Sequence, residues 1–225
     1  MFEEQMFGEF MRYKLIIFDM DGTILDTLED LTDSLNFAQK ESGMQERSLS
    51  EVREFVGNGI RKLIERAVPA NTPTDIVNRV FADFSEHYRQ NCANKTSPYD
   101  GISEVLSALR KRGVQTAVVS NKADFAVQQL SVQYFDGLFD MAVGEREGVR
   151  KKPAPDAIYA VLEYFGLEKK DALYIGDSEV DIQTADNAGM DCICVGWGFR
   201  EEDFLLRSGA TVVLNKPDDI LGYIE

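Results

Sequence analysis

The chain has 225 residues, of which 44% are hydrophobic, and a formal net charge of −15 at pH 7. This length and composition predict a globular protein with one substantial core, or a core with a smaller appended unit. Nonspecific binding to nucleic acid is disfavoured, because affinity for a phosphate backbone comes from clustered lysine and arginine. No apolar run approaches the roughly 20 residues of a membrane helix, and the acidic start MFEEQMFGEF lacks the features of a secretory signal. We therefore expect a cytoplasmic protein without a membrane partner.

The negative charge also restricts what kind of enzyme this chain can be. It repels small anionic substrates at long range, so an enzyme for phosphate esters would need a local cluster of positive charge and a metal ion. The three cysteines form neither an even disulfide set nor a CxxC pair. We expect them to be buried, reduced thiols: Cys92, Cys192 and Cys194.

The first predicted strand, LIIF at 15–18, is followed by a long stretch without strand signals. From Thr27 to about Pro98 amphipathic helical periodicity dominates, with glycine and proline as breaks. We expect helices at about 27–42, 50–55, 60–68 and 74–91. The pattern predicts an inserted all-helical unit that could hinge as a lid over the strand ends.

After the helical stretch, apolar runs and helical periodicity alternate. The strand-like runs are VQTAVVS, ALYIGD, CICVGW and TVVL. Two intervening helices carry their own end signals, since GISEVLSALRKRG ends at Gly113 and KPAPDAIYAVLEYFG ends at Gly166. Alternating strands and helices predict an α/β fold with a parallel sheet flanked by helices.

Acidic residues follow the first strand directly, in FDMDGTILDT from Phe18 to Thr27. Asp19 and Asp21 are placed where ligands bind in open parallel sheets, beyond the carboxyl end of a strand. We expect the chain to turn here, with Gly22 supplying the backbone freedom. Taken alone, an Asp-x-Asp-Gly string also fits an ordinary turn with acidic caps.

FDMDGTILDT resembles the first motif of the haloacid dehalogenase superfamily of phosphohydrolases, and three further segments follow in the family's order. VVSNK at 118–122 is similar to the second motif, KKPAP at 151–155 to the third, and YIGDSEVDIQTA at 174–185 to the acidic fourth. The resemblance covers the chain from about Lys14 onward. It implies a Rossmann-like core made of residues 1–26 and 97–225, with a helical cap domain inserted at 27–96.

The resemblance implies a phosphoric monoester hydrolase that forms an aspartyl-phosphate. Asp19 would be the nucleophile, and Asp21 would protonate the leaving oxygen and then act as base for the hydrolytic water. Lys152 would place a positive charge on the phosphate and the nucleophile. The Ser120 hydroxyl and the Asn121 backbone amide would bind phosphate oxygens.

A magnesium cofactor is part of the same expectation. Mg²⁺ prefers oxygen ligands and keeps several waters, so one or two carboxylates, a carbonyl and the substrate suffice. The resemblance assigns Asp19, Asp177 and the backbone carbonyl of Asp21 to the metal, with Asp181 in the surrounding shell. Taken alone, GDSEVD fits a helix N-terminal cap equally well.

The predicted cap carries the weakest signals for the substrate. VGNGIRKLIERAV at 56–68 resembles the cap of phosphoglycolate-phosphatase-like members. Asn58 could face the active site, and Arg61 and Lys62 could meet a second anionic group of a small phosphate ester. A helix with a solvated basic face is the alternative. Packing roles are expected for His87 and Trp197.

Two other functions stay open at this point. A sugar phosphomutase would share all four motifs and differ in letting an acceptor hydroxyl compete with water. A non-catalytic binding protein on the same fold is the second, although every position needed for chemistry is filled. A dehalogenase or phosphonate hydrolase is disfavoured, because neither needs an acid at Asp21. The sequence does not indicate an oligomeric state.

Overall fold

The computed structural model describes residues 12–224 and contains a six-stranded parallel sheet. The strand order is β5-β4-β1-β6-β7-β8. The strands are Leu15–Phe18 (β1), Gln115–Ala123 (β4), Met141–Glu145 (β5), Ala172–Gly176 (β6), Asp191–Val195 (β7) and Val213–Leu214 (β8). The predicted α/β class is confirmed, and β5 is a strand that the sequence did not indicate.

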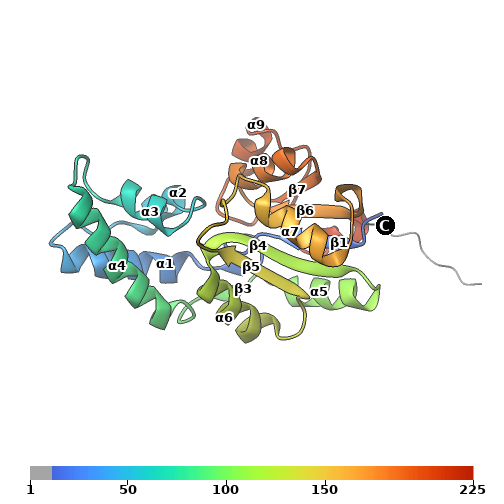
Figure 1. Ribbon diagram of the computed structural model, residues 1–225, viewed down its shortest axis with the longest axis horizontal. Helices are drawn as coiled ribbons and strands as arrows, with labels where there is room; N and C mark the ends of the chain where they lie inside the picture. Colours follow the sequence, from blue (N-terminus) through green and yellow to red (C-terminus); the bar gives the residue numbers. More distant parts are fainter. Residues whose placement is uncertain (1–11, 225) are drawn as a thin grey trace, which may run out of the picture.

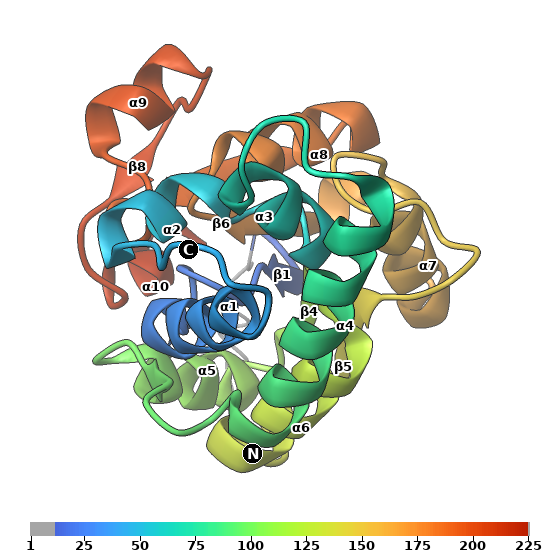
Figure 2. The same cartoon turned by 90° about the vertical axis from the view of Figure 1, so that its left-hand side faces the viewer.

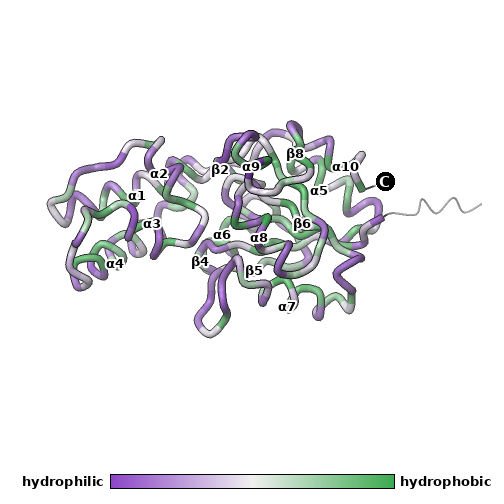
Figure 3. Tube along the Cα trace, turned by 90° about the horizontal axis from the view of Figure 1, so that it is seen from above, coloured by the Kyte–Doolittle hydropathy of each residue, from purple (hydrophilic) through white to green (hydrophobic). Residues whose placement is uncertain are grey.

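Helices cover both faces of the sheet (Figure 1). Successive side chains of a strand point to opposite faces, so Ile16 and Phe18 pack against α5, α6 and α10, while Leu15 and Ile17 pack against α7 and α8. Apolar residues follow the central strands in Figure 3. The helices are Ile102–Lys111 (α5), Asp124–Phe135 (α6), Asp156–Phe165 (α7), Glu179–Ala188 (α8), Glu202–Arg207 (α9) and Asp219–Tyr223 (α10), with a short 3₁₀ helix at Lys169–Asp171.

Four further helices lie together at one end of the molecule, as Figures 1 and 2 show. They are Leu28–Glu41 (α1), Leu49–Phe55 (α2), Ile60–Ala67 (α3) and Thr74–Asn91 (α4). Each bound agrees with the predicted helix to within one residue, so these four predictions are confirmed. α1 packs along α4. We call α1–α4 with their connecting loops the cap, and the remaining described residues the core.

Two short strands connect the cap to the core. Leu25–Asp26 (β2) and Ser97–Pro98 (β3) pair antiparallel, with Leu25 opposite Pro98. Asp30 in the first turn of α1 is buried, and its carboxylate accepts the backbone N–H groups of Lys95 at 3.0 Å and Thr96 at 2.8 Å. The segments that enter and leave the cap are therefore held side by side.

The sole histidine and the sole tryptophan have packing contacts, as expected. The His87 ring stacks on Phe37 with centroids 4.3 Å apart, and its Nδ1 lies 3.0 Å from Ser34 Oγ. The indole N–H of Trp197 donates to the carbonyl of Thr23 at 3.0 Å. Both side chains therefore have hydrogen-bond partners in the fold.

Three other expectations concern the whole chain. Cys92, Cys192 and Cys194 are free thiols, and the first and last are buried. Within residues 12–224, no helix combines the length and apolarity needed to cross a membrane. The N-terminal part of the predicted core, 1–11, lies outside the described residues, as does residue 225.

Asp30→Ala should destabilise the connection between cap and core. The change leaves the amides of Lys95 and Thr96 without their charged acceptor, which costs about 2 kcal/mol. In a chain of this size the thermal midpoint should fall by roughly 4–8 °C, measured by calorimetry. Asp33→Ala is the matched control, because this exposed carboxylate one turn along has only the Lys95 ammonium as ion-pair partner in the part of the chain that the structure describes. Equal falls of the thermal midpoint in the two variants would contradict the stabilising role of the Asp30 hydrogen bonds.

Candidate active site

The predicted catalytic residues come together at the carboxyl edge of the sheet. Asp19 directly follows β1, Ser120 lies in the last part of β4, and Asp177 directly follows β6. Lys152 belongs to the loop between β5 and α7. Because all six strands run in the same direction, their carboxyl ends meet at one edge. Segments far apart in sequence therefore share one site.

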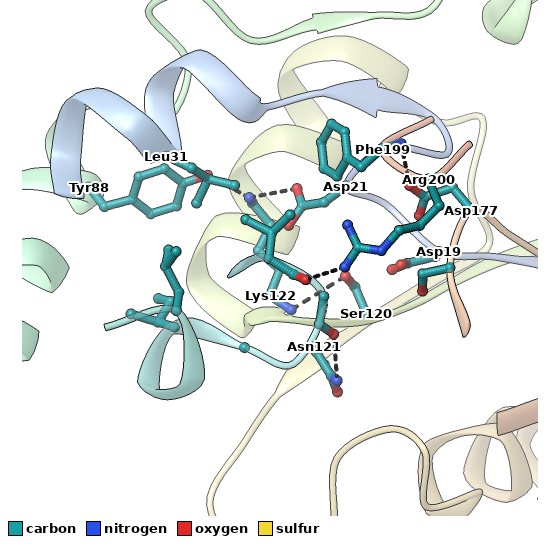
Figure 4. Close-up of a pocket in the computed structure, with 16 residues that line it drawn as sticks. Asp19, Asp21, Leu31, Tyr88, Ser120, Asn121, Lys122, Asp177, Phe199 and Arg200 are labelled. Carbon is teal, nitrogen blue, oxygen red and sulfur yellow. Dashed lines mark hydrogen bonds and ion pairs between the residues drawn. The ribbon is translucent and has the colours of Figure 1, made fainter. Parts of the chain in front are cut away.

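A pocket lies between this edge and the cap, and Figure 4 shows the side chains around it. The core contributes its polar groups, with Asp19 and Asp177 at one end and Lys122 nearer the other. The cap contributes mainly aliphatic side chains, which are Leu31, Val56, Ile60 and Leu63. The pocket thus has a charged floor and an apolar roof.

Lys152 is buried beneath Asp19 and bridges two carboxylates. Its Nζ lies 2.9 Å from Asp19 Oδ1 and 2.7 Å from Asp181 Oδ1, and it donates to the Tyr174 hydroxyl at 3.0 Å. Burial alone would lower the pKa of Lys152, but Asp181 and Asp19 together raise it above its ordinary value. The ammonium is therefore a fixed positive charge under the predicted nucleophile.

The Asn121 side chain holds the backbone of Lys152. Its Oδ1 accepts the Lys152 N–H at 2.8 Å, and its Nδ2 donates to the Lys152 carbonyl at 3.0 Å and to Gly57 of the cap at 3.1 Å. The sequence interpretation considered only the Asn121 backbone amide and missed this role. The available signal was that Asn121 directly follows Ser120 at a strand end.

Asp19 is buried with one oxygen engaged and one open. Its Oδ1 accepts the Met20 N–H at 2.7 Å and faces Lys152, whereas Oδ2 has no hydrogen-bond partner among residues 12–224. Burial raises the pKa of Asp19 to about 6, Lys152 opposes that rise, and Asp181 and Asp21 add to it. Asp19 lines the pocket, and its second oxygen is not tied up by the described residues.

Asp181 is fully buried, and both of its oxygens are engaged. Oδ1 accepts from Lys152 and from the Tyr174 hydroxyl, the latter at 3.1 Å. Oδ2 accepts the N–H of Ser178 at 3.1 Å and its hydroxyl at 2.6 Å, which closes the capping box of α8. The carboxylate therefore orients Lys152 and starts α8.

Asp177 is a buried carboxylate that lies close to two other carboxylates. Asp19, Asp177 and Asp181 each place an oxygen within 4.8 Å of the others, and all three are buried. Asp177 accepts a single hydrogen bond in the described part of the chain, from the Phe199 N–H to Oδ2 at 2.7 Å. Burial, Asp181 and Asp19 raise its pKa well above the ordinary value. These all-oxygen donors fit a hard divalent cation, with Asp19 and Asp177 the residues that keep oxygens open.

Glycines let the chain approach Asp177 closely. Gly22 has φ 78°, so the predicted turn after Asp21 is confirmed. A Cβ at Gly22 or Gly198 would collide with the Asp177 side chain. Side chains at these positions would therefore displace the carboxylate.

The pocket contains two cations that the sequence interpretation did not assign. Lys122 Nζ lies 2.8 Å from Asp21 Oδ1. Arg200 reaches from the core to the cap and donates to the carbonyls of Arg53 at 2.7 Å and Val56 at 2.9 Å. Lys122 is the last residue of VVSNK, the segment similar to the second motif, and Arg200 lies three positions after Trp197. Their partners come from distant segments.

The predicted specificity residues of the cap are not brought into the pocket. Arg61 Nε and Lys62 Nζ both pair with Glu65, at 3.0 and 2.8 Å. Asn58 Oδ1 accepts from Arg66 at 2.7 Å. The glycines on either side of Asn58 line the pocket, whereas Asn58 and Arg61 do not.

Comparison with known proteins agrees with this geometry. The model of the haloacid dehalogenase-like hydrolase family matches residues 16–195. A phosphoglycolate phosphatase of Aquifex aeolicus is 33% identical over 209 residues, 92% of this chain and 95% of its own. An N-acetylmuramic acid 6-phosphate phosphatase of Pseudomonas aeruginosa is 29% identical over 96% of both chains. A structure described as a predicted phosphoglycolate phosphatase from Haemophilus somnus has TM-score 0.90 and 30% identity, covering 96% of this chain and 100% of its own.

A divalent cation should stabilise the protein at neutral and alkaline pH. Raised carboxyl pKa values mean that the metal-free protein loses stability as pH rises through about 6, where Asp19 ionises. A saturating cation, tested as Mg²⁺, Mn²⁺ and Ca²⁺, should raise the thermal midpoint at pH 8 by roughly 3–10 °C. The rise should shrink as pH falls below about 6, because protons compete for the same oxygens.

Asp177→Asn tests whether Asp177 is responsible for the stabilisation by the cation. The amide keeps an acceptor for the Phe199 N–H and removes the uncompensated charge. We expect the metal-free midpoint to stay level or rise and the cation-dependent increase to disappear, both measured by scanning calorimetry. Asp171→Asn, which alters a carboxylate paired with Lys14, should keep the full increase. A full increase in Asp177→Asn would rule out this site.

Proposed function

The chain belongs to the haloacid dehalogenase-like hydrolases, and we propose that it is a magnesium-dependent phosphatase of small, phosphoglycolate-like monoesters. One observation carries the proposal. Asp19 lines the pocket with one carboxylate oxygen free of partners among residues 12–224, while a buried ammonium, that of Lys152, holds its other oxygen. A nucleophile beside a fixed positive charge is the arrangement that phosphoryl transfer requires. It also argues against a purely binding role, which needs no reactive oxygen.

In the proposed first step, Asp19 Oδ2 attacks phosphorus and the bond from phosphorus to the ester oxygen breaks. The departing alkoxide takes a proton from the carboxyl group of Asp21, which lines the same pocket. The Ser120 hydroxyl and the Asn121 backbone amide donate to phosphate oxygens. Lys152 offsets the negative charge that Asp19 and the phosphate bring together.

In the proposed second step, Asp21, now a carboxylate, takes a proton from water. The water oxygen attacks phosphorus, and the bond from phosphorus to Asp19 breaks, which releases inorganic phosphate and restores both aspartates. Mg²⁺ held by Asp19, Asp177 and the Asp21 carbonyl would supply positive charge to the phosphate oxygens. Asp181 supports this arrangement through Lys152.

We further propose that residues 27–96 move as a domain relative to 1–26 and 97–225. The hinge would be the β2–β3 pair, and Figure 3 labels β2 between the two parts. Closing the cap over the strand ends would exclude water, so the charges in the pocket interact more strongly.

The pocket roof favours a small leaving group over a sugar. Leu31, Val56, Ile60 and Leu63 offer no side-chain hydrogen bonds, and the hydroxyl of Tyr88 is already bonded to Lys122. A buried sugar hydroxyl without a partner costs about 1–3 kcal/mol. The roof therefore disfavours the sugar phosphomutase alternative, and Arg200 in the same pocket offers a positive charge for the carboxylate of a short acid.

Asp19→Asn should abolish catalysis while leaving the fold intact. Asparagine cannot form the aspartyl-phosphate, so phosphate release with Mg²⁺ should fall by at least about 10³-fold. Colorimetric phosphate detection over a panel of esters, with Mg²⁺ or with EDTA, measures this. Asp203→Asn, at an exposed position in α9, should retain wild-type activity. Equal activity of Asp19→Asn and wild type would remove the nucleophile assignment.

The panel should also separate substrates. We expect kcat/KM for phosphoglycolate to exceed that for glucose 6-phosphate by about 10²-fold or more, because two or more sugar hydroxyls would lose their partners. N-acetylmuramic acid 6-phosphate belongs in the panel because a relative acts on it. Isomer detection with glucose 1-phosphate should find no glucose 6-phosphate. Preference for a hexose phosphate, or isomer formation, would contradict the proposed substrate class.

A further inference from the structure

Asp21 is held by one oxygen, and its other oxygen is open. The Thr27 hydroxyl donates to Oδ1 at 2.8 Å, and Lys122 Nζ donates to the same atom at 2.8 Å. Oδ2 has no hydrogen-bond partner within residues 12–224. The Asp21 side chain is 22% exposed and lines the pocket, whereas the Lys122 side chain is 1% exposed. The Asp21 carboxyl group is thus held through Oδ1 alone.

Lys122 is in turn held by the cap. Its Nζ donates to the hydroxyl of Tyr88, a fully buried residue of α4, and lies 4.8 Å from the centroid of that ring. Burial alone would lower the pKa of Lys122, but Asp21 and Tyr88 together raise it above its ordinary value. A buried ammonium that loses a partner is costly, so its position depends on both contacts. Figure 4 shows Tyr88 and Asp21 on either side of the pocket end that contains this ammonium.

The two buried lysines of the site have separate partners. Lys152 forms ion pairs with Asp19 and Asp181, and Lys122 forms an ion pair with Asp21. Neither ammonium pairs with the carboxylates of the other in the described part of the chain. The nucleophile and the acid are therefore paired with different ammonium groups, and of these two lysines only Lys122 contacts a side chain of α4 in the cap.

We infer that Lys122 and Tyr88 are positioning residues for Asp21, so that the cap orients the group that protonates the leaving oxygen. Tyr88 fixes the ammonium, and the ammonium and Thr27 fix Oδ1, which leaves Oδ2 as the oxygen that carries the proton. The inference rests on the proposed phosphatase function. Its consequence is that the acid is fully oriented only when α4 lies against the core.

Leaving-group dependence tests the inference. An alkyl phosphate needs a proton on its leaving oxygen, whereas 4-nitrophenolate departs largely without one. kcat/KM reports the steps up to formation of the aspartyl-phosphate. Lys122→Met should lower kcat/KM for ethyl phosphate about 10²-fold and for 4-nitrophenyl phosphate less than about 3-fold. Ethyl phosphate is chosen because it has no second charged group that Lys122 could contact directly.

Tyr88→Phe provides a second, milder variant that keeps the packing of the ring. It should lower kcat/KM for ethyl phosphate by about 5-fold and leave kcat/KM for 4-nitrophenyl phosphate unchanged. This variant therefore tests the inference even if Lys122→Met does not fold. Tyr13→Phe is the matched control, because Tyr13 is equally buried and donates to Asp191 at 2.7 Å ahead of β1. Its two kcat/KM values should match wild type.

A double variant separates action through Asp21 from an independent effect. In an Asp21→Asn background, Lys122→Met should have no further effect on kcat/KM for ethyl phosphate. Equal losses on the two substrates, a loss confined to phosphoglycolate, or a full additional loss in the double variant would each overturn the inference. Absence of phosphate release by the wild type would instead refute the proposed function.

Discussion

Burial of several carboxylates at one edge of the sheet is the constraint on which the rest of the site depends. Like charges in a desolvated place raise each other's pKa and destabilise the folded state unless cations match them. Lys152, Lys122 and the first turn of α8 stabilise three of the carboxylates, whereas Asp177 has no ion-pair partner among residues 12–224. The buried carboxylates are those of Asp19, Asp177 and Asp181, and the partly exposed carboxylate of Asp21 lines the same pocket as two of them.

This constraint explains why so acidic a chain can accept an anionic substrate. The net charge of −15 acts at long range and is screened by salt, whereas the interactions at the pocket floor act over about 3 Å under little screening. Two ammonium groups and a bound divalent cation would offset the carboxylates of the pocket, so the phosphate would not meet an uncompensated negative charge there. The acidic composition therefore bears on which molecules the protein attracts at long range. It does not determine the chemistry of the pocket.

Much of this arrangement could be predicted from sequence because it follows from a periodic pattern. Alternating strands and helices predict a parallel sheet, and a parallel sheet brings Asp19, Ser120 and Asp177 to one edge whatever the loops do. The four cap helices followed from their 3.6-residue periodicity and their breaks. By contrast, β5 carries few of the β-branched residues that mark the other strands, so MAVGE gave no strand signal.

The contacts that were missed depend on how the cap meets the core. Lys122 and Asp21 are 101 residues apart, and no local pattern sets the rotation of α4 that brings Tyr88 to them. Arg61 shows the converse, since an exposed basic residue with an acid four positions along forms an ordinary helix pair. Sequence pattern therefore locates residues on elements, whereas side-chain partners across two units require the packed structure.

Under the proposed function, the pocket cations would give the cap a part in the chemistry as well as in the exclusion of water. Arg200 satisfies carbonyls at the end of α2, which have no partner inside their own helix, and Lys122 donates to Tyr88 of α4. An open cap would return these carbonyls to water at little cost. Lys122, buried under Tyr88, would lose a partner in the same motion. Covering the substrate and orienting the acid would then be a single event.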